Sequence, residues 1–186
     1  AVSVPVVVTP TTTPTATFTQ TNVRCIGGND GSIIVTAADG ILPYSYSIDG
    51  GTTFQPSNIF AGLTAGAYTI VVKDAKNCDT VTIPVTITEP TALAATAVLT
   101  QGLTCGTGNA AQAAVVTINV TAGTGTAPYQ YSFNSNGFGS NNVLTLNDNG
   151  ADQPYTYEVR DAKGCIVSGS GTLLRLNPPT DLTFAA

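Results

Sequence analysis

The sequence repeats itself, and this repetition constrains the fold more than any other feature. Residues 43–47 (PYSYS) return as residues 128–132 (PYQYS), and residues 72–78 (VKDAKNC) return as residues 159–165 (VRDAKGC). A fixed period of this size indicates that each copy is one structural unit and that the units are stacked along the chain. The chain is therefore expected to hold two small domains in tandem, each large enough for a modest core of its own.

Each copy reads as a series of β-strands. Only 9% of the residues are charged, and a chain rich in Val, Thr, Ala and Gly but poor in Glu, Lys, Leu and Met favours strands and turns over helices. Alternating segments separated by Gly and Asx turns predict strands in the first copy. They are residues 16–20, 31–37, 44–48, 67–73 and 79–88, with short strands near 54 and 59–60. The expected fold is all-β, a tandem of immunoglobulin-like antiparallel β-sandwiches of six or seven strands each.

Three local features refine this expectation. Residues 49–51 (DGG) follow a strand and predict a hairpin turn, in which glycine supplies the positive φ. Tyr68 stands where a tyrosine corner is expected at the start of a late strand, and Tyr155 is its match in the second copy. Pro84 cannot donate a hydrogen bond to a neighbouring strand, so the last strand should lie at a sheet edge or carry a bulge.

The ends of the chain extend the repeat pattern. Residues 1–10 resemble residues 81–90 and are expected to be the last strand of a preceding repeat, followed by repeat 1 at 11–90 and repeat 2 at 91–179. Residues 180–186 resemble the start of a following repeat. Because the sequence starts with Ala1 and contains no Met, we expect it to be a processed product or a middle portion of a longer array, with short Pro-containing joints between its domains.

The first copy resembles the SprB repeat of Bacteroidetes gliding-motility and cell-surface adhesins. The resemblance is carried by residues 25–33 (CIGGNDGSI), 43–51 (PYSYSIDGG), 60–63 (FAGL), 66–68 (GAY) and 73–78 (KDAKNC). It covers nearly all of residues 16–90, whereas residues 91–179 keep the Pro-Tyr and Asp-Ala-Lys-Gly-Cys parts and Cys105 but lack the Asp-Gly-Ser-Ile and Asp-Gly-Gly signatures. The resemblance implies type IX secretion and display on the extracellular face of a bacterial cell, as filaments used in attachment or gliding motility.

Composition excludes several classes of function. A net charge of −5 with six Lys and Arg residues that do not cluster leaves little to neutralise a phosphate backbone, so no nucleic-acid partner is expected. No apolar run approaches the roughly 20 residues that span a bilayer, so no membrane insertion is expected in this segment. Because the chain has no His, the common nucleophile–base pairs cannot form, and we expect neither an enzyme nor a cofactor.

The four cysteines are candidates for disulfides in an oxidising compartment. They are Cys25 and Cys78 in the first copy and Cys105 and Cys165 in the second, and without a Cys-x-x-Cys pair or a His they fit disulfides better than a metal site. Pairing within each copy would close loops of about 50 to 60 residues and stabilise each copy by about 4 kcal/mol.

The number of strands between the two cysteines of a copy decides which pairing is possible. An even number of strands between the two cysteines puts both at the same end of the sandwich, where they can pair within the copy. An odd number puts them at opposite ends, so that Cys25 could reach Cys165 while Cys78 and Cys105 would pair with repeats outside this segment. A third alternative leaves the thiols unpaired.

Carboxylates beside turn residues pose a separate question. Asp30, Asp39, Asp49 and Asp148 lie next to Gly or Asn, and turn formation and solubility account for such placements. The alternative is Ca²⁺ held by turn carboxylates and carbonyls, but no Asp-x-Asp-x-Asp spacing supports it. We therefore expect no metal site.

Two features bear on sugars. The pairs Tyr44/Tyr46 and Tyr129/Tyr131 alternate along a strand, so that both members face one side. We expect them to pack in the core, with a sugar-stacking surface as the alternative. Thr80, in an Asp-Thr-aliphatic sequence, is a candidate for O-glycosylation.

The leading hypothesis for function is a segment of a secreted cell-surface filament or adhesin that spaces and displays a binding tip. Its partners would be neighbouring repeats of the same chain. A second hypothesis is a self-assembling filament subunit in which residues 2–9 complete the sandwich of another filament protomer by strand addition. A third, a carbohydrate-binding module for surface glycans, would need an exposed aromatic platform.

Overall fold

The computed structural model describes residues 12–80, 82–105 and 111–176, and the chain divides into unit 1 (Ala1–Pro90) and unit 2 (Thr91–Ala186). The strand expected in residues 1–10 and the start of a following repeat expected in residues 180–186 lie outside the described residues. Every regular element of the described ranges is a strand, and none of these residues belongs to a helix that could cross a membrane. The strands of unit 1 are β1 (Thr15–Thr21), β2 (Gly31–Ala38), β3 (Ser45–Ser47), β4 (Ile59–Leu63), β5 (Gly66–Lys73) and β6 (Ile83–Ile87).

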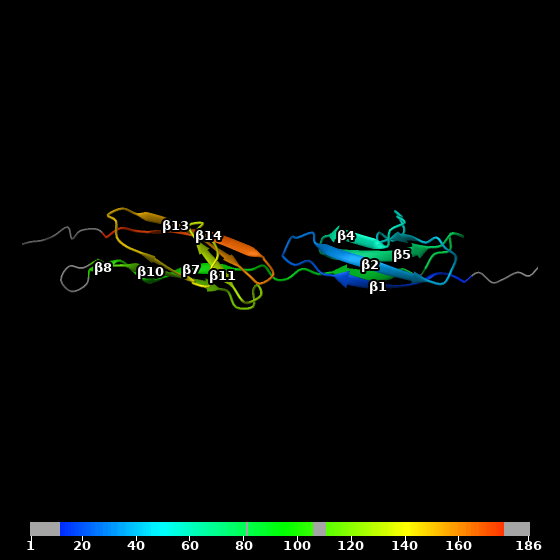
Figure 1. The fold of residues 1–186 in the computed structure, drawn as a ribbon, viewed down its shortest axis with the longest axis horizontal. Helices are drawn as coiled ribbons and strands as arrows, with labels where there is room; N and C mark the ends of the chain where they lie inside the picture. The colour runs from blue at the N-terminus through cyan, green and yellow to red at the C-terminus, as the bar shows by residue number, and fades with distance from the viewer. Residues whose placement is uncertain (1–11, 81, 106–110, 177–186) are drawn as a thin grey trace, which may run out of the picture. The chain divides into compact units, whose positions relative to one another are not determined.

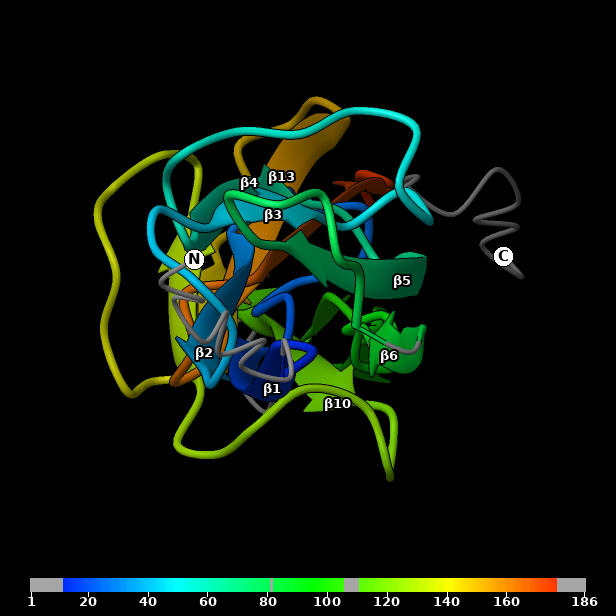
Figure 2. The same cartoon turned by 90° about the vertical axis from the view of Figure 1, so that its right-hand side faces the viewer.

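Unit 1 is a sandwich of two antiparallel sheets, with strand orders β1-β2-β4 and β3-β5-β6 (Figures 1 and 2). The alternation of β2 builds its core, because Ile33 and Val35 are fully buried while Ile34 between them is 41% exposed. Ile70 and Val72 of β5 face them from the other sheet, and both are fully buried. The all-β sandwich predicted from the sequence is confirmed, and its strands fall within a few residues of the expected ranges.

Unit 2 repeats this architecture. Its strands are β7 (Ala95–Gln101), β8 (Thr104–Cys105), β9 (Ala111–Gln112), β10 (Ala114–Val120), β11 (Gln130–Phe133), β12 (Val143–Leu146), β13 (Gln153–Arg160) and β14 (Ile166–Leu173). The sheets have the orders β7-β10-β12 and β11-β13-β14, and Figure 1 shows β13 and β14 in one layer and β7 and β10 in the other. The short β8–β9 pair has no counterpart among the described residues of unit 1. Unit 2 thus keeps the six strands of unit 1 and adds a short antiparallel pair.

The local features predicted for unit 1 lie where the sequence indicated, whereas Tyr155, the expected corner residue of unit 2, has its ring over Gly171. Gly50 and Gly51 adopt positive φ angles of 75° and 90° in the hairpin turn. The Tyr68 hydroxyl donates to the carbonyl oxygen of Thr64 at 2.9 Å, which is the hydrogen bond of a tyrosine corner. Pro84 sits in β6, an edge strand of its sheet, where its missing N–H costs no ladder hydrogen bond.

The chain makes an odd number of passes between the two cysteines of unit 1. Besides β2, β3, β4 and β5, the segment at Gln55 runs antiparallel to β3, since the Gln55 and Tyr46 amides donate to each other's carbonyl oxygens at 2.9 and 2.8 Å. Unit 2 has the same extra pass, where Gly139 pairs with Tyr131. Each sandwich therefore has an N-terminal end, where its first strand begins, and an opposite C-terminal end, where its last strand stops.

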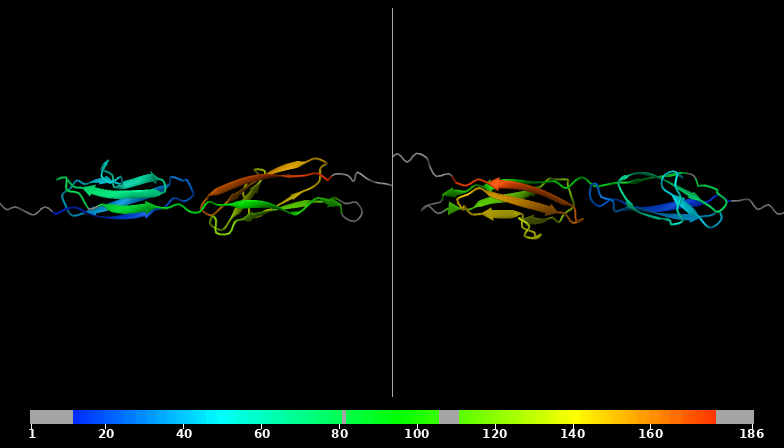
Figure 3. Two further views of the ribbon diagram at one scale, coloured as in Figure 1. Left: turned by 180° about the vertical axis from the view of Figure 1, so that it is seen from behind. Right: turned by 90° about the horizontal axis from the view of Figure 1, so that it is seen from above.

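Two tyrosines of β13 lie over two glycines of β14. In the antiparallel register Tyr155 pairs with Gly171 and Tyr157 with Gly169, and both tyrosines are buried, at 9% and 7% exposure. A Cβ atom added at either glycine would come closer than 3.0 Å to the ring opposite. The glycines therefore provide the space into which the rings fold, and the rings in turn cover the bare backbone of β14. Figure 3 shows these two strands, in orange to red, side by side.

We expect Gly171→Ala to destabilise unit 2 by about 1 to 3 kcal/mol, because the new methyl group would displace the Tyr155 ring from the core. Chemical denaturation of the whole chain, followed by tyrosine fluorescence, measures this loss. Gly102→Ala is the matched control, since a Cβ there meets nothing within 4 Å. Equal stability of the two variants would contradict the packing role of Gly171.

Candidate functional site

A buried carboxylate organises the loop between β5 and β6 in unit 1. Asp74 is 5% exposed, and its Oδ1 accepts hydrogen bonds from the backbone N–H groups of Lys76 at 2.8 Å and Cys78 at 2.9 Å. Its Oδ2 accepts from the N–H of Ile41, in the β2–β3 loop, at 3.1 Å. These amide donors, with the Cys78 N–H as the largest cause, hold the pKa of Asp74 below its usual range. One side chain thus fixes Cys78 at the N-terminal end of unit 1.

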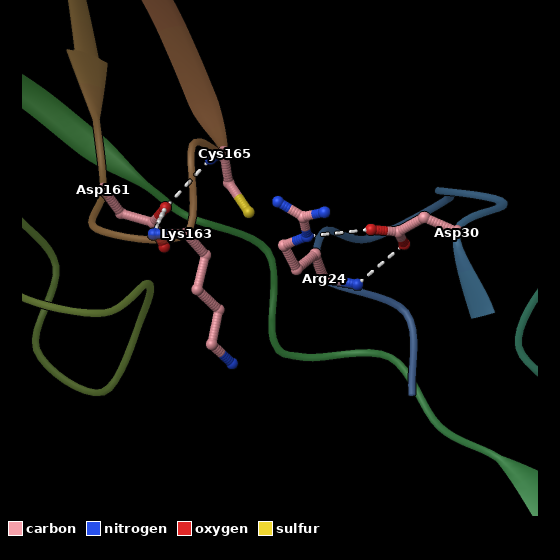
Figure 4. A network of polar contacts seen from close by, with 5 residues as sticks. All are labelled: Arg24, Asp30, Asp161, Lys163 and Cys165. Carbon is pink, nitrogen blue, oxygen red and sulfur yellow. Dashed lines mark hydrogen bonds and ion pairs between the residues drawn. The ribbon is translucent and has the colours of Figure 1, made fainter. Parts of the chain in front are cut away.

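Unit 2 builds the same loop around Asp161, which is 6% exposed. Its Oδ1 accepts from the N–H groups of Lys163 and Cys165, both at 2.9 Å (Figure 4). Its Oδ2 accepts from the N–H of Thr126 at 2.9 Å, the counterpart of the Ile41 contact. Cys165 therefore occupies in unit 2 the position that Cys78 occupies in unit 1.

The C-terminal end of unit 1 carries the other cysteine. Cys25 follows the buried Val23, whose N–H donates to the Thr88 carbonyl oxygen at 3.0 Å just after β6. Beside it, Arg24 donates from its backbone N and its Nε to the two carboxylate oxygens of Asp30, each at 3.0 Å (Figure 4). The backbone hydrogen bond from Arg24 is the largest cause of the lowered pKa of Asp30. The loop that holds Cys25 is thus tied both to itself and to the end of the last strand.

The disulfide pairing within each repeat is not the one in the structure. Cys25 and Cys165 are disulfide-bonded, whereas Cys78 and Cys105 are free thiols. Each expected pair, Cys25 with Cys78 and Cys105 with Cys165, would join one bonded and one free cysteine, so neither pair forms. The reason is the odd number of passes, which places the two cysteines of a repeat at opposite ends. The eight residues of β5 alone span about 26 Å, whereas a disulfide requires Cα atoms within about 7 Å.

The turn carboxylates serve as hydrogen-bond acceptors. Asp49 accepts from the Ser47 hydroxyl at 2.6 Å and from the Thr53 N–H and hydroxyl at 2.9 and 2.5 Å, and the Ser47 hydrogen bond is the largest cause of its lowered pKa. Asp39 accepts from the Thr15 hydroxyl and Asp148 from the Gly150 N–H. Among the described residues no three His, Cys, Asp or Glu side chains gather as metal ligands would.

The paired tyrosines pack against the cores. Tyr44 and Tyr46 contact each other edge to face, with ring centroids 6.5 Å apart, and both contact the core of unit 1. Tyr129 and Tyr131 pack against the core of unit 2. The Tyr129 hydroxyl donates to the Thr124 carbonyl oxygen at 2.9 Å. These placements favour the packing role over a sugar-stacking surface.

Thr80 lies in a buried position. Its hydroxyl oxygen accepts from the Val72 N–H at 3.0 Å, and its own N–H donates to the Val72 carbonyl oxygen at 2.9 Å. In the folded repeat the hydroxyl is therefore part of the sheet and not a surface group. This placement argues against Thr80 as an O-glycosylation site.

Two contacts that both units share were not predicted from the sequence. Asn58 and Asn142 each donate from Nδ2 to a strand carbonyl, of Val35 at 2.7 Å and of Ile118 at 3.0 Å, while their own backbone oxygens accept from the same two residues. An Asn directly before the short fourth strand of each copy was the available signal. The second feature is a cation held over an aromatic ring, Lys73 over Phe54 and Arg160 over Phe138, at 4.5 and 4.1 Å. It joins positions too far apart in sequence to be noticed there.

Unit 2 also has a polar hollow of about 420 Å³ over β11, β13 and β14. Its lining includes Ser132, Ser168, Ser170, Thr156 and Glu158. These side chains offer hydroxyls and one carboxylate. The cysteine-bearing ends are therefore the most defined chemical features of the two units.

Part of the first repeat matches a known family. Residues 17–53 match the family model of the SprB repeat, which confirms the resemblance found from the motifs over these residues. No curated protein matches the chain.

Solved structures with distant similarity include fibronectin(III)-like modules of Clostridium thermocellum CbhA, at 14% identity and a TM-score of 0.34, covering 86% of this chain and 94% of that chain. Another is a structure of protocadherin gamma B7 extracellular cadherin domains 1–4, at 13% identity and a TM-score of 0.27, covering 76% of this chain and 43% of that chain. The strand order and register, and not these likenesses, define the fold.

We expect Asp74→Asn to lower the melting temperature of unit 1 at pH 7 by an amount on the order of 5 °C, because the amide turns one acceptor oxygen into a donor that faces the Ile41 N–H. The folded-state pKa of Asp74 is lowered, so the ionised carboxylate stabilises the fold above the unfolded-chain value of about 3.9. This contribution is lost as the pH falls through the folded-state pKa. The melting difference between the variant and the wild type should therefore shrink between pH 7 and about pH 2.

Asp79→Asn is the control, since the Asp79 side chain is half exposed and its ion pair with Lys73 is long, at 3.7 Å. Circular dichroism melts of all three proteins at both pH values measure the effect. A melting difference that stayed constant with pH would contradict the role given to the Asp74 carboxylate.

Proposed function

We propose that this chain is a segment of an extracellular array of β-sandwich repeats, exported by type IX secretion and displayed on a bacterial cell surface. It spaces and presents a binding tip that takes part in surface attachment or gliding motility. The single observation that carries the proposal is the match of residues 17–53 to the SprB repeat within a chain that folds as two units of one architecture.

The construction of the units supports a spacing role. Their polar side chains are used to hold loops in place, as with Asp74, Asp161 and Asp49. Small domains built in this way stay folded independently of one another, which suits a long array. Disulfide-bonded cysteines are typical of proteins that work in an oxidising compartment, in keeping with an extracellular location.

The described surface also favours spacing over recognition. The aromatic pairs are used in the cores. The large apolar side chains that remain exposed lie in small groups, such as Ile34 beside Ile59 across β2 and β4, and Leu99 with Leu174 around one hollow of unit 2. The exposed side chains in these groups are aliphatic, so they offer no aromatic platform on which a sugar could stack. The binding of surfaces or glycans is therefore assigned to another part of the parent protein. The filament alternative depends on residues 2–9, which lie outside the described residues.

Antibodies raised against the purified chain should label intact cells of the source bacterium, because the proposal places both units outside the cell. Deletion of residues 12–176 from the parent protein should shorten the reach of the surface structure and leave the binding of its tip intact. An excess of the purified chain should not compete with cells for attachment. Labelling confined to broken cells would contradict surface display, and efficient competition would contradict a spacing role.

Sedimentation separates the spacer from the filament alternative. With Cys78 and Cys105 alkylated, the purified chain should sediment as a monomer at every concentration. Ordered fibres formed under these conditions would instead support strand addition between protomers.

A further inference from the structure

We propose that Cys78 and Cys105 are disulfide-forming positions that link copies of this repeat head to tail. The free thiol at the C-terminal end of one copy, Cys105, would bond to the free thiol at the N-terminal end of another, Cys78. The partner is thus a second copy of this chain, or a further repeat of the same kind. The proposal does not depend on the function proposed above, since it requires no more than tandem repeats in an oxidising environment.

The N-terminal ends of the two units are built alike. Cys78 and Cys165 each donate a backbone hydrogen bond of 2.9 Å to a buried aspartate, Asp74 and Asp161. In each unit the N–H of that aspartate donates back to the cysteine carbonyl oxygen, at 3.1 and 3.0 Å. The two cysteines therefore have the same local structure. Cys165 is disulfide-bonded, which shows that a cysteine held in this loop is accessible to disulfide formation.

The C-terminal ends of the two units also place their cysteines alike. Cys25 stands two residues after Val23, and Cys105 stands two residues after Leu103, and both of these apolar residues are buried, at 3% and 8% exposure. Val23 joins the main core of unit 1, while Leu103 packs with Ala114 and Leu173 where the last strand of unit 2 stops. Cys25 is disulfide-bonded. At each kind of end, then, the cysteine of one unit is disulfide-bonded and the equivalent cysteine of the other unit is a free thiol.

Neither free thiol has a disulfide partner within its own repeat. The odd number of passes places Cys78 and Cys25 at opposite ends of unit 1, and Cys105 and Cys165 at opposite ends of unit 2. Each free thiol is nevertheless accessible, because Cys105 is exposed and Cys78 is half-buried. A bond from either thiol must therefore leave its repeat through the end at which it stands.

The direction of the bond follows from the same placement. A contact between unlike ends repeats in one direction and builds a chain of copies, whereas a contact between like ends closes a pair. The two free thiols are one of each kind, Cys105 at a C-terminal end and Cys78 at an N-terminal end. A bond between them joins unlike ends in the same order in which repeats follow one another along the sequence. We therefore expect Cys105 to prefer Cys78 of another copy over a second Cys105.

The chemistry is thiol–disulfide exchange with a low-molecular-weight disulfide such as oxidised glutathione. The Cys105 thiolate attacks one sulfur of the reagent, forming a mixed disulfide and releasing one glutathione thiolate. The Cys78 thiolate of the second copy then attacks the Cys105 sulfur, which forms the protein–protein bond and releases the second glutathione. Two protein thiols are oxidised, one reagent disulfide is reduced, and the two thiol protons pass to the two released glutathiones.

Two single variants test the proposal on the full chain. Cys78→Ser leaves Cys105 as the free thiol, and Cys105→Ser leaves Cys78, so neither variant alone contains both partners of the proposed bond. The two are given tags of different mass, mixed in equal amounts in a glutathione redox buffer, and resolved on a non-reducing gel. We expect the mixed dimer to exceed clearly the half of all dimers that random pairing gives, and peptide mapping to identify a Cys78–Cys105 link.

The wild-type chain should form a ladder of multimers that collapses on reduction. Circular dichroism establishes that both variants are folded, and Cys→Ala variants replace them if serine disturbs the fold. Mixed dimers at or below half of the total, or the absence of dimers, would overturn the proposal. Either result leaves the cell-labelling experiment unaffected, so failure of the linkage and failure of the surface role are distinguishable.

Discussion

Each repeat depends on one buried carboxylate at its N-terminal end. Asp74 and Asp161 collect three backbone N–H groups each, and in doing so they satisfy donors that no strand could reach. The same oxygens join two loops, the one after β2 to the one after β5 in unit 1, and the one after β10 to the one after β13 in unit 2. Because the two strands belong to different sheets, these hydrogen bonds tie the sheets together at this end. The cysteine that follows the aspartate acquires a fixed position as a consequence. The loop that follows the aspartate thus both closes this end of the sandwich and holds a cysteine that can form a disulfide.

The number of strand passes decides what that thiol can do. Because the chain makes an odd number of passes between the cysteines of a repeat, they stand at opposite ends, and each can react only outside its own sandwich. A disulfide of this kind does not stabilise one domain by closing a loop within it. The bond proposed between Cys105 and Cys78 of another copy would instead transmit tension from one copy to the next, without requiring large cores in the small domains.

Much of the fold was accessible from the sequence. The alternation of β2, with Ile33 and Val35 inside and Ile34 outside, predicts a strand because the side-chain period of two is a local property. The Asp-Gly-Gly turn and the edge position of Pro84 follow from backbone chemistry in the same way. The extra pass at Gln55 could not be counted with the same assurance. It pairs with Tyr46 through two backbone hydrogen bonds, and backbone pairing leaves little trace in the identity of side chains. The Asn58 and Asn142 contacts and the cations over Phe54 and Phe138 were missed for a related reason, since each joins residues that are distant in sequence.

The sequence by itself determined the repeat, the all-β class, the family resemblance of the first copy and the positions of four cysteines, because these depend on periodicity and residue type alone. The tertiary structure decided which cysteines are bonded, that Thr80 is buried, and that the paired tyrosines belong to the cores. These properties depend on where the chain returns after each turn. One additional strand pass reverses the end at which a residue emerges, and that reversal alone separates a disulfide within a repeat from one that must be made outside it.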